Sequence, residues 1–178
     1  MVDQKTWNDV LAALCGAAED FGGVWAERRW MNTPGPVYTA DSDFALLGPT
    51  NVPEHVALDD ERIDIVYRQP CTLAEASRVI RAASIDPFTG YACDGNKFWT
   101  PDGVREWWAR RGEILRHIEE NLMSDSWWGF PCELPVVHTV ATSWKTFLKS
   151  RAEEYLRKYC YFLDTGKWPS AGDHLPDL

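Results

Sequence analysis

The chain is rich in large aromatic side chains: it holds ten tryptophans, seven phenylalanines and six tyrosines in 178 residues. Each ring removes a large apolar area from water when it is buried, so most of them have to lie in a core. Because 45% of the residues are hydrophobic, an intrinsically disordered chain is excluded. The length suits one domain. We therefore expect a single packed domain over residues 1–169 and a flexible tail over 170–178, which is polar and contains Gly and Pro.

Apolar residues at intervals of three and four predict four helices. Two of these helices begin with a recognisable cap. Thr72 is followed by Glu75 in a capping-box pattern, and Thr100 precedes a proline at the first helical position. The predicted helices cover residues 4–20, 72–84, 101–123 and 144–163.

Short runs of alternating or β-branched residues predict strands between and beside these helices. The runs lie at residues 24–31, 37–39, 44–47, 62–68 and 136–141. Helical and strand-like segments do not alternate strictly, which disfavours a parallel sheet with helices on both faces. We expect an α+β fold in which a mostly antiparallel sheet of three to five strands packs against about four helices.

Acidic residues are concentrated in the first third of the chain. The formal net charge is −9, and residues 1–64 contribute −8 of it through twelve acidic and four basic side chains. A field of this sign repels phosphate, so direct nucleic-acid binding is disfavoured. It favours a basic protein partner instead, because complementary charge speeds association and selects the partner.

The densest acidic stretch, residues 54–64, is preceded by two further aspartates. These acids form either a docking surface or a solvated loop before a strand. Two tryptophans in an irregular segment either pack in the core or anchor a partner, since tryptophan is enriched at interface hot spots. The residues that we predict for the partner-binding surface are Asp41, Asp43, Glu54, Asp59, Asp60, Glu61, Asp64, Trp127 and Trp128.

These observations predict a non-catalytic binding protein of the inhibitor or toxin-neutralising immunity type. Its partner would be a basic protein such as a toxin or a nuclease. We expect a cytoplasmic protein, because residues 1–20 show no secretory signal and five dispersed cysteines are typical of reduced thiols. No run of about 20 apolar residues predicts a membrane span. We expect neither a cofactor nor a metal.

The alternative is a small enzyme or ligand-binding domain centred on residues 86–99, a segment with no regular period. Cys93 would act as a thiol nucleophile there, with Asp94, Tyr91 and His138 as further candidates. The same segment also suits a plain turn in which Cys93 is a small buried hydrophobic residue. The chain has no Gly-x-Ser-x-Gly, glycine-rich phosphate loop or His-Glu-x-x-His motif to favour a particular reaction.

A zinc site made of Cys71, Cys93, Cys132 and His138 is a weaker alternative. Zinc ligands usually come in closely spaced pairs, such as two cysteines separated by two to four residues. No such pair occurs in this chain. Scattered core thiols and one ordinary histidine are the simpler interpretation.

Overall fold

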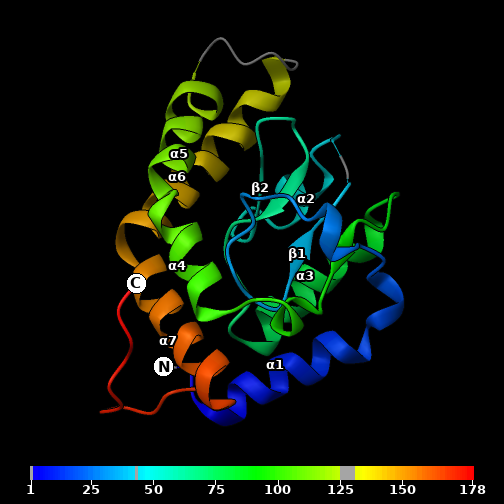
Figure 1. Cartoon of the computed structure of the whole chain (residues 1–178). Coiled ribbons are helices and arrows are strands. Elements are labelled where there is room, and N and C mark those ends of the chain that lie inside the picture. The colour runs from blue at the N-terminus through cyan, green and yellow to red at the C-terminus, as the bar shows by residue number, and fades with distance from the viewer. Residues whose placement is uncertain (1, 43, 125–130) are drawn as a thin grey trace.

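The computed structural model describes residues 2–42, 44–124 and 131–178, and these are mainly helical (Figure 1). Their α-helices are α1 (Gln4–Gly16), α2 (Leu47–Asn51), α3 (Leu73–Ile85), α4 (Pro101–Ala109), α5 (Arg111–His117), α6 (Leu134–Ser150) and α7 (Ala152–Thr165). Their strands form two antiparallel pairs, β1 (Tyr38–Thr39) with β4 (Tyr91–Ala92), and β2 (Val56–Leu58) with β3 (Asp64–Val66). The expected α+β fold with a sheet of three to five strands is therefore wrong, because the described residues form a helix-dominated fold with two minimal sheets.

The clearest error in the expected fold is the strand over residues 136–141, which lies inside α6. The β-branched run favours a strand locally, but Val137, Val140, Ala141 and Trp144 are all buried on one face of the helix. They follow one another at intervals of three, one and three residues, which is the spacing of one helix face. This face continues into the helix predicted over residues 144–163. Burial of that face therefore outweighs the modest intrinsic preference of valine for strands.

The other expected strands are short or absent. Residues 24–31 contain the 3-10 turn Trp25–Glu27, and residues 44–47 lead into α2. Residues 37–39 and 62–68 do contain strands, but these are two and three residues long. Extended segments therefore cross the middle of the molecule without forming a continuous ladder.

Three of the four predicted helix starts are confirmed, whereas the start predicted at residue 144 is wrong, because α6 begins at Leu134. The Thr72 side chain accepts a hydrogen bond from the Glu75 N–H at 3.2 Å, and Thr100 caps α4 in the same manner. The predicted helix over 101–123 is interrupted at Arg110, where ψ is 1°, and continues as α5 and a π-helical turn. The predicted helix over 144–163 is likewise interrupted, at Arg151, which separates α6 from α7.

Helices α4 to α7 lie together on one flank of the molecule, and α1 with α3 lies on another (Figure 1). The two strand pairs and the extended segments lie between these groups. The larger core cluster contains the fully buried rings of Trp7, Trp144 and Tyr159. No helix of the described residues combines the length and the apolar character that a membrane span requires.

Asn32 connects the central segments through its side chain. It is fully buried, and its amide nitrogen donates to the carbonyls of Arg29 at 2.8 Å and Thr39 at 2.9 Å. Its amide oxygen accepts from the backbone N–H groups of Thr39 at 3.1 Å and Val66 at 2.8 Å. One side chain thus satisfies buried backbone groups that a sheet partner would otherwise satisfy.

Gln69 does the same for the neighbouring turn. Its amide nitrogen donates to the carbonyls of Thr33 at 2.8 Å and Val37 at 2.6 Å, and its oxygen accepts from the Val37 N–H at 3.1 Å. A Cβ atom at Gly35 would lie 2.3 Å from Cδ of Gln69. Glycine is therefore required at residue 35 for this side chain to reach both carbonyls.

The last residues of the chain lie against α7. The Arg157 guanidinium donates to the carbonyls of Leu175 at 3.0 Å and Pro176 at 2.8 Å, and it pairs with Asp177. The expected division into a domain over 1–169 and a flexible tail over 170–178 stays a prediction.

We predict that Asn32→Ala lowers the free energy of unfolding by about 4 kcal/mol or more, measured by urea denaturation. Each buried backbone group that loses its partner costs about 1–3 kcal/mol, and this side chain serves several. Asn51→Ala is the control, because the exposed Asn51 makes one side-chain hydrogen bond, to the Leu47 carbonyl. We expect a loss below about 1 kcal/mol there. Equal losses for the two variants would contradict the role of Asn32.

Candidate functional site

Asp59, one of the acids predicted for the partner surface, is buried, with 1% of it exposed. Its Oδ2 accepts from Nε of Arg29 at 2.5 Å, and its Oδ1 accepts from the backbone N–H groups of Glu61 at 2.9 Å and Ile63 at 3.0 Å. Burial raises the pKa of Asp59 above its ordinary value, and Arg29 and the two N–H groups oppose that shift. This carboxylate therefore organises its own loop and is not available to a partner.

Asp64 is also buried, with 1% of it exposed. Its Oδ2 accepts a hydrogen bond from the Tyr91 hydroxyl at 2.9 Å, which links β3 to β4. A Cβ atom at Gly48 would lie 2.1 Å from the same oxygen. Asp64 is thus enclosed by the protein and lies away from the exposed surface.

The remaining acids of the predicted surface that the structure describes are exposed, but two of them are already in ion pairs. Glu54 pairs with Arg78 at 3.4 Å, and Glu61 pairs with Arg29 at 2.9 Å. Asp41 and Asp60 are exposed and make no ion pair within the described residues. Asp43, Trp127 and Trp128 lie outside the described residues.

Asp41 belongs to a different exposed surface, which three chain segments form together. The Gly22 N–H donates to the Thr89 carbonyl at 3.1 Å, and the Ala40 N–H donates to the Gly90 carbonyl at 2.8 Å. These bonds bring the segments after α1, after β1 and after α3 side by side. We call the surface that they form the acidic edge and define it by its residues Glu19, Asp20, Asp41, Phe44 and Phe88.

Asp86 holds the acidic edge in place. Its buried carboxylate accepts from the Ser42 hydroxyl at 3.0 Å and from the N–H groups of Phe88 at 3.1 Å and Gly90 at 2.7 Å. The Asp86 carboxylate thus links two segments: the turn that contains Phe88 and the segment that precedes Phe44.

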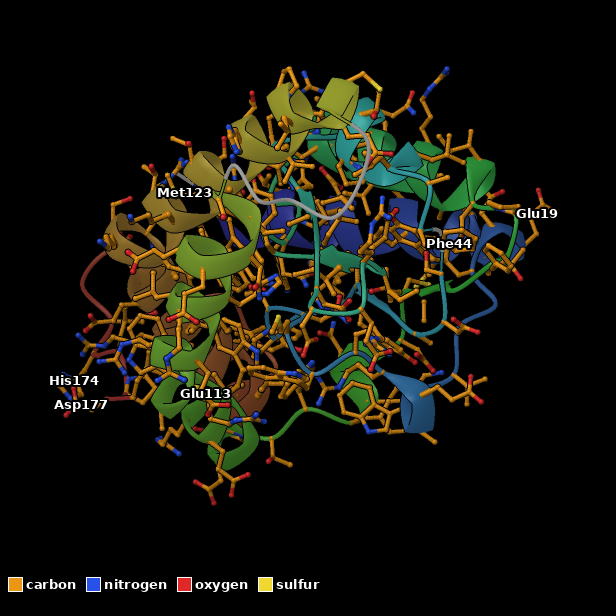
Figure 2. All side chains as sticks on the ribbon, turned by 90° about the horizontal axis from the view of Figure 1, so that it is seen from above. Glu19, Phe44, Glu113, Met123, His174 and Asp177 are labelled. Atoms are coloured by element: carbon orange, nitrogen blue, oxygen red, sulfur yellow. The ribbon has the colours of Figure 1, made fainter. Side chains whose placement is uncertain are left out.

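The acidic edge carries two exposed aromatic rings. Phe44 is 57% exposed and Phe88 is 51% exposed, and their ring centroids lie 6.0 Å apart. Leu46 and Thr89 adopt left-handed backbone with φ of 65° and 51°, a conformation that costs side-chain-bearing residues about 1–2 kcal/mol. Figure 2 shows Phe44 on the same side of the molecule as Glu19.

The three segments that form the acidic edge contain charged residues of one sign. The segments 18–23, 40–44 and 86–90 contain five acidic residues and no lysine or arginine. Sequence reasoning missed Phe44 and Phe88, because it read the first as part of a strand and the second as part of a turn. The sequence did hold a signal for these two rings. In each of two irregular segments, a phenylalanine stands beside acidic or turn-forming residues, where an apolar ring is often exposed.

The loop over residues 86–99 does not arrange a nucleophile and a base. The Cys93 thiol is half-buried and contacts the Leu14 carbonyl at 3.8 Å. Burial raises the pKa of Cys93 to about 11, and the neighbouring Cys15 and Asp94 add to the shift. Within the described residues no hydrogen bond joins Cys93 to a histidine, and His138 lies on α6.

The other candidates of this loop have structural partners. Asp94 accepts from the Tyr38 hydroxyl at 3.0 Å and pairs with Lys97 at 3.8 Å. Tyr91 is buried and donates to Asp64. Cys93 and Asp94 also border a hollow of about 430 Å³ against α1, so ligand binding there stays a prediction.

The four residues considered for zinc are not gathered into a site. Within the described residues, no group of three or more histidine, cysteine or acidic side chains is arranged to hold a metal ion. Cys71, Cys93 and Cys132 are free thiols.

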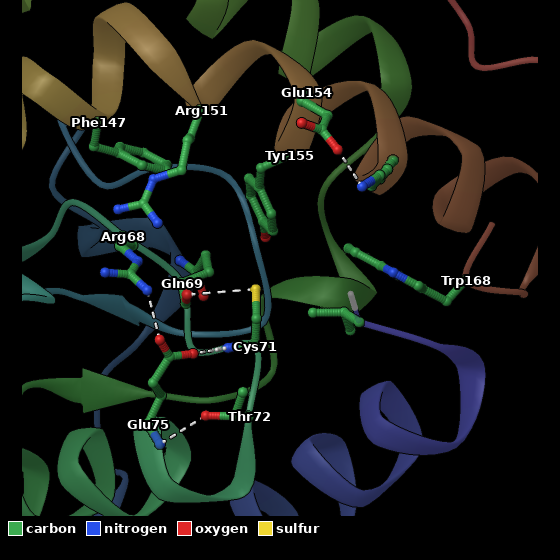
Figure 3. A pocket seen from close by; sticks show the side chains of 12 residues that line it. Arg68, Gln69, Cys71, Thr72, Glu75, Phe147, Arg151, Glu154, Tyr155 and Trp168 are labelled. Carbon is green, nitrogen blue, oxygen red and sulfur yellow. Dashed lines mark hydrogen bonds and ion pairs between the residues drawn. The ribbon is translucent and has the colours of Figure 1, made fainter. Parts of the chain in front are cut away.

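A second cavity, which sequence reasoning did not anticipate, lies between the N-terminus of α3 and the junction of α6 with α7 (Figure 3). Its volume is about 290 Å³. We call it the cationic pocket, and its defining residues are Arg68, Arg151, Lys158, Phe147, Tyr155 and Trp168. These residues come from segments that are up to 100 positions apart in the sequence, so no local motif marks them.

Comparisons with known proteins add no further constraint on the site. No protein-family model matches the chain, and no curated protein or solved structure matches it significantly. The functional argument therefore depends on the residues themselves.

We predict that iodoacetamide at pH 7.5 modifies Cys15 and Cys132 at least about tenfold faster than Cys93, as measured by mass spectrometry of the labelled peptides. Cys15 and Cys132 are exposed. A thiol with a pKa of about 11 is almost entirely protonated at this pH, and the thiolate is the reactive form. Labelling of Cys93 as fast as that of Cys15 would instead support its role as a nucleophile.

Proposed function

We propose that the chain docks a basic protein partner through the acidic edge. The observation that carries this proposal is the exposed pair of Phe44 and Phe88, held 6.0 Å apart on segments that contain acids and no basic residue. This proposal keeps the partner class expected from the sequence and moves the contact surface away from residues 54–64.

Aromatic rings and acids contribute differently to such an interface. Buried aromatic anchors supply most of the binding energy at protein interfaces, and the acids around them exclude wrong partners and speed association. The −8 charge of residues 1–64 extends this attraction beyond direct contact. The partner should therefore present an apolar side chain surrounded by lysine or arginine.

Stoichiometric neutralisation of a toxin or nuclease in the cytoplasm suits this surface. A small rigid edge with aromatic anchors and one sign of charge can cover a basic active site without chemistry of its own. The five free cysteines agree with a reducing compartment.

We predict that a photo-crosslinking residue placed at position 88 captures a discrete basic protein in cells of the native host. The same residue at position 123 is the control, because Met123 is also exposed and lies on the other side of the molecule from Phe44 (Figure 2). The yield at position 88 should fall when salt is raised, since ions screen exposed charge. No product specific to position 88, or an acidic product, would remove the proposal.

We predict that Phe44→Ser with Phe88→Ser weakens binding of that partner by about 2 kcal/mol or more, the magnitude of an interface hot spot, measured by calorimetry. Glu19→Lys with Asp41→Lys should mainly slow association, measured by stopped flow. Asp60→Lys is the control, because Asp60 is also exposed but belongs to the stretch predicted from sequence. A larger effect of Asp60→Lys than of the double charge reversal would place the interface on that stretch instead.

A further inference from the structure

The cationic pocket gathers positive charge in a chain whose net charge is −9. Arg68, Arg151 and Lys158 border it, against two acids, Glu75 and Glu154. The side chains of the pocket therefore carry a formal charge of +1. A local charge opposite to that of the whole molecule requires a separate explanation.

Two of the three cations are already neutralised. Nη2 of Arg68 lies 2.5 Å from Oε1 of Glu75, and Lys158 pairs with Glu154. The other oxygen of Glu75 accepts from the Cys71 N–H at 2.8 Å, so this carboxylate is fully used.

Arg151 is the remaining cation. Its guanidinium makes no hydrogen bond or ion pair with any described residue. Figure 3 shows Arg151 on the same side of the pocket as Arg68, whose guanidinium points toward Glu75. Because Arg68 is paired with Glu75, Arg151 is the cation of this pocket that an entering anion would neutralise.

Trp168 forms part of the opposite wall with its ring. The residue is 3% exposed, and its indole Nε1 is buried without a hydrogen-bond partner within the described residues. Its ring stacks on Trp7 with centroids 4.1 Å apart and extends toward Tyr155 (Figure 3). Trp7, Trp99 and Trp144 also keep buried indole N–H groups without a partner, but they do not line this pocket.

The rest of the pocket wall is mixed, because Gln69 and Thr72 also line it, but both side chains already make hydrogen bonds within the protein. Phe147 and Tyr155 present their rings, and the Tyr155 hydroxyl is used by a 3.0 Å hydrogen bond to the Pro34 carbonyl. The Cys71 thiol adds no charge, because burial raises its pKa to about 12. A volume of about 290 Å³ lies at the lower end of the range for ligand pockets, which indicates a small molecule.

We propose that the cationic pocket binds a small organic carboxylate, whose charge lies at Arg151 and whose apolar body lies against Phe147, Tyr155 and Trp168. A guanidinium matches the planar carboxylate with two parallel hydrogen bonds. The single excess positive charge matches a monoanion, whereas a phosphate dianion would also meet Glu75 and Glu154. This binding is separate from the docking of a basic partner on the acidic edge.

The test measures binding of phenylacetate, 3-phenylpropionate and octanoate to the full chain by calorimetry and by NMR. We expect saturable binding of at least one of them. 3-Phenylpropionamide, which has the same shape and no charge, should bind at least about tenfold more weakly, since hydrogen bonds to charged groups are the stronger ones. The variant Trp168→Phe identifies the NMR signal of the Trp168 indole N–H, because that signal is missing from its spectrum. In the unmodified chain this signal should shift when the carboxylate is added.

Arg151→Gln should weaken carboxylate binding at least about tenfold, whereas Arg116→Gln should not change it. Arg116 is the matched control because it is exposed on α5 and does not border the pocket. Equal binding of acid and amide, an unchanged affinity in Arg151→Gln, or no saturable binding of any of the three carboxylates would overturn the proposal. Tighter binding of phenyl phosphate than of every carboxylate would overturn the assigned ligand class.

Discussion

The structure depends on two buried side-chain amides that replace a sheet. Extended segments cross the interior without a full ladder of strands, and every buried backbone N–H and carbonyl there needs a partner. Asn32 and Gln69 provide those partners by bridging segments up to 36 positions apart. Because each amide both donates and accepts, a single side chain replaces several ladder bonds. The strands can then remain two or three residues long while these buried backbone groups keep their partners.

This arrangement explains which parts of the fold the sequence predicts. Helix starts depend on local chemistry, and the caps at Thr72 and Thr100 are visible from three or four consecutive residues. The replacement of a sheet by Asn32 has no local signature, because its partners include Val66 and become neighbours only after folding. The same holds for residues 136–141. Their β-branched composition can be read locally, but the packing against the core that favours a helix there involves residues distant in the sequence.

The candidate site shows the same limit in its electrostatics. Charge counted along the chain treats Asp59, Asp64 and Asp41 alike, yet the first two are buried and only the third faces solvent. A carboxylate next to a turn can be exposed, or it can be buried and accept hydrogen bonds from the backbone of that turn, as Asp86 does. The sequence therefore predicts the sign of the electrostatic field and its approximate position along the chain. Which surface is acidic depends on which carboxylates are buried in hydrogen bonds to the backbone and which remain exposed.

The acidic edge and the cationic pocket should respond differently to salt, because they act over different distances. The proposed docking of a basic partner would benefit from the charge of the whole molecule, and a Debye length of about 8 Å at physiological salt removes most of that long-range attraction. A carboxylate at Arg151, which is exposed, would be held at contact distance. The net charge of −9 would repel that ligand on approach, and salt would reduce this repulsion as well. Added salt should therefore weaken the proposed docking far more than the proposed carboxylate binding, so a series of ionic strengths separates the two proposals.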